Sequence, residues 1–112
     1  SPKRLVIDSL NAFAILYSDE TEQRKALSKL FELVHKWDIT TLATLERESD
    51  HDRHEASVLE FGTDSVILVY NEKHKKSRVR SLEIYKMRGT KHAQKTFSMN
   101  ISDKGLAVGP IP

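Results

Sequence analysis

The order of apolar segments between residues 1 and 45 constrains the fold of this chain more than any other feature. Leu5, Val6 and Ile7 form a continuous apolar run that ends in Asp8, which predicts a short strand covered on both faces. A helical pattern follows, and then a second run of strand-forming residues from 39 to 45. A strand, a long crossover and another strand predict a right-handed βαβ unit with parallel pairing.

The helix of this unit has the clearest periodicity in the sequence. From Glu22 to Trp37, apolar residues follow the i, i+3, i+4, i+7 spacing of one helix face. They are Leu27, Leu30, Phe31, Val34 and Trp37. Residues 18 to 21 are of the types that cap helices, and residues 10 to 17 predict a shorter helix before them. We therefore expect an amphipathic helix packed on a sheet.

The pattern changes in the second half of the chain. Residues 47–53 predict a loop, residues 54–61 a short helix, and Ser65 to Tyr70 a third buried strand. Residues 78–87 and 95–101 then alternate apolar and polar side chains, as half-exposed antiparallel strands do. A turn at residues 103–105 precedes a last short strand at 106–108. Without internal repeats or low-complexity segments, residues 1–112 predict a single domain.

Composition excludes several classes of protein. With 112 residues, 38% hydrophobic and 30% charged, the chain has the balance of a small globular domain. No apolar run approaches the roughly 20 residues that span a bilayer, and the first residues lack the shape of a signal peptide. The absence of cysteine excludes disulfides and thiolate metal sites. We expect a cytoplasmic protein without membrane association.

Two charged segments are candidate binding sites. Five of the nine residues from Glu72 to Arg80 are lysine or arginine. A solvated hairpin turn explains this cluster best, and binding to a nucleic acid is the alternative, although no aromatic residues are interleaved for base stacking. His51 to Glu55 offers imidazole and carboxylate groups, but their spacing matches no recognised metal site, so a polar loop is the preferred interpretation.

Residues 4 to 10, Arg-Leu-Val-Ile-Asp-Ser-Leu, have the form of a Walker B strand. Ligands of open α/β sheets bind beyond the carboxyl ends of the strands, and an aspartate there can hold Mg²⁺ beside nucleotide phosphates, usually through water. Taken alone, this short motif is better explained by a turn residue that ends a strand.

Later segments resemble, in the same order, those of RecA-like ATPases of the KaiC/RadA type. Residues 40–46 resemble the next core strand, 62–69 the segment Ala-Asp-Gly-Val-Ile-x-Leu, 86–92 the specific loop Lys-Met-Arg-Gly-Thr-x-His, and 97–110 the closing hairpin. The resemblance implies an α/β fold: the C-terminal half of a RecA-like P-loop NTPase core. Parallel strands with helices should be followed by antiparallel C-terminal hairpins.

The chain departs from the family in three respects. No G-x-x-x-x-G-K-[S/T] occurs in its 112 residues, so no nest of backbone N–H groups and no lysine is available for the phosphates. The family's catalytic glutamate lies upstream of the Walker B strand. Leu45 precedes Glu46 where relatives often carry serine, which weakens a sensor role for Glu46. We expect a truncated or stand-alone part of an ATPase that does not hydrolyse ATP alone.

The resemblance also implies a site for ATP and Mg²⁺ between subunits of the intact protein. Asp8 would hold the magnesium ion, with Ser9, Glu46 and His92 beside the nucleotide. In relatives that form rings, the Lys-x-Arg loop reaches the neighbour's nucleotide, so Lys86 and Arg88 would act in trans. Residues i and i+2 of a strand point the same way, which suits a pair of cations, although a solvated edge strand would look the same.

The partial core has a geometric consequence. In RecA-like sheets the phosphate-loop strand lies between the strands expected at 39–45 and 65–70, so both would have an unpaired edge here. Such edges favour pairing with another chain, and we expect a ring, a swapped dimer or another homo-oligomer. Two alternative functions stay open: a non-catalytic regulatory or interaction module with the same half-fold, and a nucleic-acid-binding domain that uses the basic hairpin.

Overall fold

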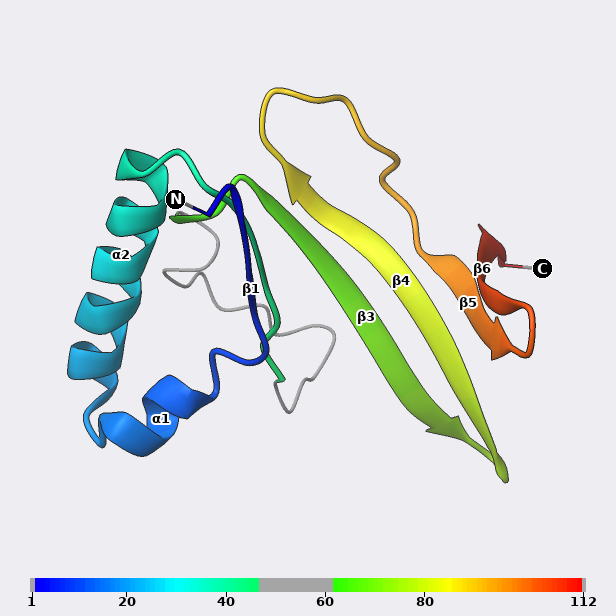
Figure 1. The fold of residues 1–112 in the computed structure, drawn as a ribbon. Coiled ribbons are helices and arrows are strands. Elements are labelled where there is room, and N and C mark those ends of the chain that lie inside the picture. Colours follow the sequence, from blue (N-terminus) through cyan, green and yellow to red (C-terminus); the bar gives the residue numbers. More distant parts are fainter. Residues whose placement is uncertain (1, 47–61, 112) are drawn as a thin grey trace. The chain divides into compact units, whose positions relative to one another are not determined.

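The computed structural model describes residues 2–46 and 62–111, which belong to two compact units (Figure 1). The N-terminal unit is Ser1–Gly62 and the C-terminal unit is Thr63–Pro112. The loop and helix expected between residues 47 and 61, and the candidate metal segment His51 to Glu55, lie outside the described residues. That the two units form a single domain stays a prediction.

The N-terminal unit is the expected βαβ arrangement. Its elements are β1 (Arg4–Ile7), α1 (Ala12–Leu16), α2 (Glu20–Lys36) and β2 (Thr40–Ala43). β1 and β2 pair in parallel, from Arg4 opposite Thr40 to Ile7 opposite Ala43. The parallel pairing predicted from the order strand, helix, strand is therefore confirmed.

α2 begins and ends as its sequence indicates. The Asp19 side chain caps the N-terminus by accepting a hydrogen bond of 2.9 Å from the Thr21 backbone N–H. Phe31 and Val34 are buried, which confirms the predicted apolar face. Trp37 does not belong to that face, because the helix ends at Lys36 and the Trp37 side chain is 59% exposed. Beyond the last turn, helical spacing no longer determines where a side chain points.

β1 differs from the expectation of a strand covered on both faces. Leu5 and Ile7 are half-buried, whereas Val6 is 66% exposed and lies opposite Leu42, which is 64% exposed. Within the described residues, the β1–β2 pair therefore has one covered face and one open apolar face. A continuous apolar run permits either arrangement, since the second layer must come from elsewhere in the chain or from another chain.

The C-terminal unit is a four-stranded antiparallel sheet in the order β3-β4-β5-β6. The strands are β3 (Ser65–His74), β4 (Ser77–Met87), β5 (Phe97–Ser102) and β6 (Gly105–Pro110). The alternating segments predicted antiparallel strands, and this is confirmed. The expected third buried strand is instead longer, pairs antiparallel with β4, and leaves Ile67 and Val69 more than half exposed.

Among the described residues, β2 pairs only with β1, and β3 pairs only with β4. Each of these strands therefore has one edge without a strand partner in that part of the chain. Pairing of these edges with another chain stays a prediction. The described helices include none that is both long enough and apolar enough to cross a membrane.

Candidate functional site

Asp8 lies directly after β1, at the edge where the carboxyl ends of the two parallel strands meet. The Thr44 hydroxyl, directly after β2, donates a hydrogen bond of 2.7 Å to Asp8 Oδ1. Backbone bonds fix this geometry, because Thr44 N–H donates to Ile7 O at 3.0 Å and Leu10 N–H to Thr44 O at 2.8 Å. The exposed Asp8 carboxylate is therefore held in one orientation at the ligand-binding edge of an α/β sheet.

Asn11 also belongs to this edge, although no sequence motif singles it out. Its Nδ2 donates to Glu46 O at 2.9 Å, and its Oδ1 accepts from Glu46 N–H at 2.9 Å. The Ser9 hydroxyl donates to the same Oδ1 at 2.9 Å. An asparagine directly before a helix ordinarily indicates a cap, and no sequence signal points to a partner 35 residues away.

Within the N-terminal unit, the structure thus brings together three of the predicted site residues, Asp8, Ser9 and Glu46. Around Asp8 the groups are carboxylate, hydroxyl and carbonyl oxygens, which are the ligands that a hard cation such as Mg²⁺ prefers. The donor set therefore fits the metal that the resemblance implies. At this edge Asp8 is not part of a larger cluster, since the described residues contain no group of three or more histidine or acidic side chains placed to hold a metal ion.

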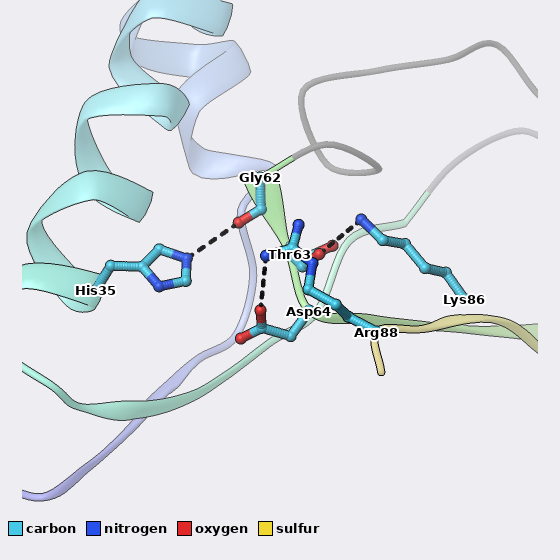
Figure 2. Close-up of polar contacts among 6 residues, drawn as sticks. All are labelled: His35, Gly62, Thr63, Asp64, Lys86 and Arg88. Carbon is cyan, nitrogen blue, oxygen red and sulfur yellow. Dashed lines mark hydrogen bonds and ion pairs between the residues drawn. The ribbon is translucent and has the colours of Figure 1, made fainter. Parts of the chain in front are cut away.

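Lys86 and Arg88 contact two consecutive residues at the start of the C-terminal unit, Lys86 the first and Arg88 the second (Figure 2). Lys86 Nζ donates to Thr63 O at 2.8 Å. Arg88 Nη1 lies 3.1 Å from Asp64 Oδ1, and Arg88 N–H donates to Asp64 O at 2.8 Å. Both cations are therefore oriented by the segment that leads into β3.

A β-bulge determines which face of the sheet Lys86 occupies. Ile84 lies opposite Ile67, but Lys86 lies opposite Val66, so Tyr85 is an extra residue in β4. Val66 and Ile67 are neighbours in a strand and point to opposite faces. The bulge consequently moves Lys86 to the face opposite that of Ile84, which strict alternation along β4 would not predict.

His92 lies in the segment between β4 and β5, in the C-terminal unit. Its Nδ1 is 3.0 Å from the carbonyl oxygen of Ala93, and its side chain is half-buried. Its predicted place beside a nucleotide stays a prediction.

The basic cluster from Lys73 to Arg80 forms the end of the β3–β4 hairpin. Lys75, with φ of 56°, and Lys76 form the turn between His74 and Ser77, and residues 71 to 79 are exposed. The interpretation as a solvated hairpin turn is therefore confirmed.

The family model described as "ATPase: KaiC" matches residues 1–112. This chain belongs to the KaiC ATPase family. A KaiC-like protein from Pyrococcus horikoshii has a similar structure, with a TM-score of 0.78 and 31% identity, over 96% of this chain and 47% of that one. The RecA-like fold implied by the sequence is thereby confirmed.

Two curated KaiC relatives are circadian clock oscillator proteins. The one from Acaryochloris marina is 33% identical over 110 residues, which are 97% of this chain and 21% of the relative. The one from Synechococcus elongatus is 30% identical over 110 residues, with 97% and 21% covered. The chain therefore spans about a fifth of the length of these KaiC relatives and about half of the archaeal structure.

Proposed function

We propose that this chain supplies the Walker B side of a KaiC-type ATP site and, to a neighbouring subunit, a pair of phosphate-binding cations. The observation that carries the proposal is the Asp8 carboxylate, oriented by the Thr44 hydroxyl at the carboxyl edge of the parallel β1–β2 pair. Open α/β sheets bind their ligands at this edge.

Residues of the N-terminal unit would have different roles at this edge. Asp8 would hold Mg²⁺, usually through water, and the ion would supply positive charge that orients the nucleotide phosphates. Thr44 keeps the carboxylate in one rotamer. Asn11 binds the Glu46 backbone, and the Ser9 hydroxyl donates to Asn11 Oδ1. The main chain that carries the exposed Glu46 side chain is therefore fixed.

Lys86 and Arg88 would serve the nucleotide of the adjacent subunit. A phosphoryl group in transfer carries high negative charge, and two preoriented cations stabilise it. The bulge at Tyr85 and the contacts of residues 63 and 64 preorient both side chains. This role in trans requires self-association, which we expect of the intact protein.

The 112 residues contain no phosphate-binding loop, so we expect no ATP hydrolysis by this chain alone. A chimera tests the rest of the proposal. This chain replaces the matching segment of the KaiC-like protein from Pyrococcus horikoshii, and Mg²⁺-dependent ATP hydrolysis is measured. We expect activity from the chimera and loss of it with Asp8→Asn.

The role in trans is tested by mixing two inactive chimeras. One carries Arg88→Ala, which should lower kcat by about 10³-fold, and the other lacks the lysine of its phosphate-binding loop. Recovery of hydrolysis on mixing supports a site shared between subunits, and Arg78→Ala is the matched control. If the Arg88→Ala chimera keeps full activity, the arginine role is wrong. A chimera that folds and binds ATP without hydrolysis would favour a non-catalytic module.

A further inference from the structure

Two consecutive residues, Thr63 and Asp64, contact both cations of the Lys-Met-Arg segment, but they do so through different chemistry. Lys86 donates to a neutral backbone carbonyl, that of Thr63. Arg88 instead has a carboxylate partner, Asp64, at 3.1 Å. The Lys86 contact is therefore to a neutral group, whereas the Arg88 contact pairs opposite charges (Figure 2).

We propose that Asp64 is a positioning residue that occupies the guanidinium of Arg88 until a phosphate replaces it. The Asp64 carboxylate is the chemical equivalent of a phosphate edge: a planar or near-planar pair of anionic oxygens that an arginine binds by charge-assisted hydrogen bonds. This inference rests on the proposed function of Lys86 and Arg88. A bound phosphate would have to displace the Asp64 carboxylate from Arg88.

The exposure of the pair makes such an exchange easy. The side chains of Arg88 and Asp64 are 54% and 65% exposed, and an ion pair of this kind contributes only about 0.2–1 kcal/mol. A phosphate group with two negative charges is a stronger partner for the same guanidinium.

The main chain keeps the segment in place during the exchange. Arg88 N–H donates to the backbone oxygen of Asp64 at 2.8 Å, and this bond does not involve either side chain. The next residue pair, Ser65 and Met87, continues the β3–β4 ladder. Release of the guanidinium from Asp64 therefore leaves this backbone bond, and the strand end beside Lys86, in place.

The experiment titrates the 112-residue chain with sodium tripolyphosphate and follows the Nε–H resonance of Arg88 by NMR. Asp64→Asn keeps the shape of the side chain and removes its charge, and Asp64→Glu keeps the charge. Asp103→Asn, in the β5–β6 turn, is the control for an equal change in net charge. Arg88→Gln and Lys86→Ala, followed through the backbone amides of residues 86–90, test the cations themselves.

We expect Asp64→Asn to bind tripolyphosphate about 1.5- to fivefold more tightly than wild type, since the energy of an exposed ion pair corresponds to that factor. Asp64→Glu and Asp103→Asn should stay close to wild type. Equal tightening in Asp64→Asn and Asp103→Asn, or none in either, would overturn the role of Asp64. Binding that survives both Arg88→Gln and Lys86→Ala, or is absent from every variant, would instead overturn the proposed role of the cations, and the inference with it.

Discussion

The carboxamide of Asn11 and the peptide group of Glu46 bind each other through two hydrogen bonds, each 2.9 Å long. Asn11 follows β1, and Glu46 follows β2, so these bonds extend the pairing of the two strands beyond the last ladder residues. An amide side chain can do this because it offers one donor and one acceptor, as a backbone peptide group does. The edge that carries Asp8 is thereby fixed from both strands.

Asn11→Ala should lower the free energy of unfolding by about 1–3 kcal/mol, because two hydrogen bonds are lost and the Glu46 peptide group loses its partner. Asn11→Asp should also destabilise, since a carboxylate cannot donate to Glu46 O. Urea unfolding measures both, with Asn100→Ala on the exposed part of β5 as control. Equal stability of Asn11→Ala and Asn100→Ala would contradict this role.

Gly62→Ala should destabilise the N-terminal unit by about 1–3 kcal/mol. A Cβ at this position would lie 2.5 Å from Phe31 Cδ2, and the Phe31 ring is part of the buried face of α2. At Gly109 an added Cβ would meet nothing within 4 Å, so Gly109→Ala is the matched control. Thermal unfolding of both variants makes the comparison, and an unchanged midpoint for Gly62→Ala would show that the Phe31 ring can move aside.

Tyr70 makes the stability of the C-terminal unit depend on pH above 10. Burial first, and then the hydrogen bond from its hydroxyl to the Glu83 carboxylate, raise the pKa of Tyr70 from 10.0 to about 12. The folded state therefore favours the neutral phenol. This contribution, on the order of 2–3 kcal/mol, is fully present below pH 10 and is lost as the pH rises to about 12.

Tyr70→Phe checks this directly. The variant should be less stable than wild type at neutral pH and should lose less stability between pH 10 and 12. Denaturant unfolding at a series of pH values gives the difference, and the tyrosinate absorbance transition near pH 12 should be absent from the variant. If the free energy of unfolding of Tyr70→Phe falls with pH as steeply as that of wild type, Tyr70 is not the cause of the pH dependence.

Thr44→Val should weaken the Mg²⁺ dependence of ATP hydrolysis in the chimera by about 10- to 100-fold, the usual effect of removing the partner that orients a metal ligand. Valine has the shape of threonine but cannot donate to Asp8 Oδ1. Thr40→Val, at an exposed position of β2, is the control. If magnesium titrations of the two variants coincide, Thr44 does not orient the carboxylate.

Short-range features of the sequence were sufficient for most of the secondary structure. The cap at Asp19, the buried face with Phe31 and Val34, and the hairpin turn at Lys75 depend on neighbours within one or two turns of chain. The resemblance to the family added the RecA-like fold and named Asp8 and Arg88 as candidate site residues. No sequence motif indicated the hydrogen-bonding or ion-pair partners of these two residues.

Tertiary structure alone decided the partners of those residues, because each partner is chosen by strand register or by a contact across many residues. The exposed face of Val6, the bulge that turns Lys86, and the bonds of Asn11 to Glu46 all depend on which segments lie side by side. Sequence fixes periodicity and capping through local sterics and hydrogen bonds. Local sequence does not determine which distant residue binds a carboxylate such as Asp8 or a cation such as Arg88, since many pairings satisfy the same local pattern.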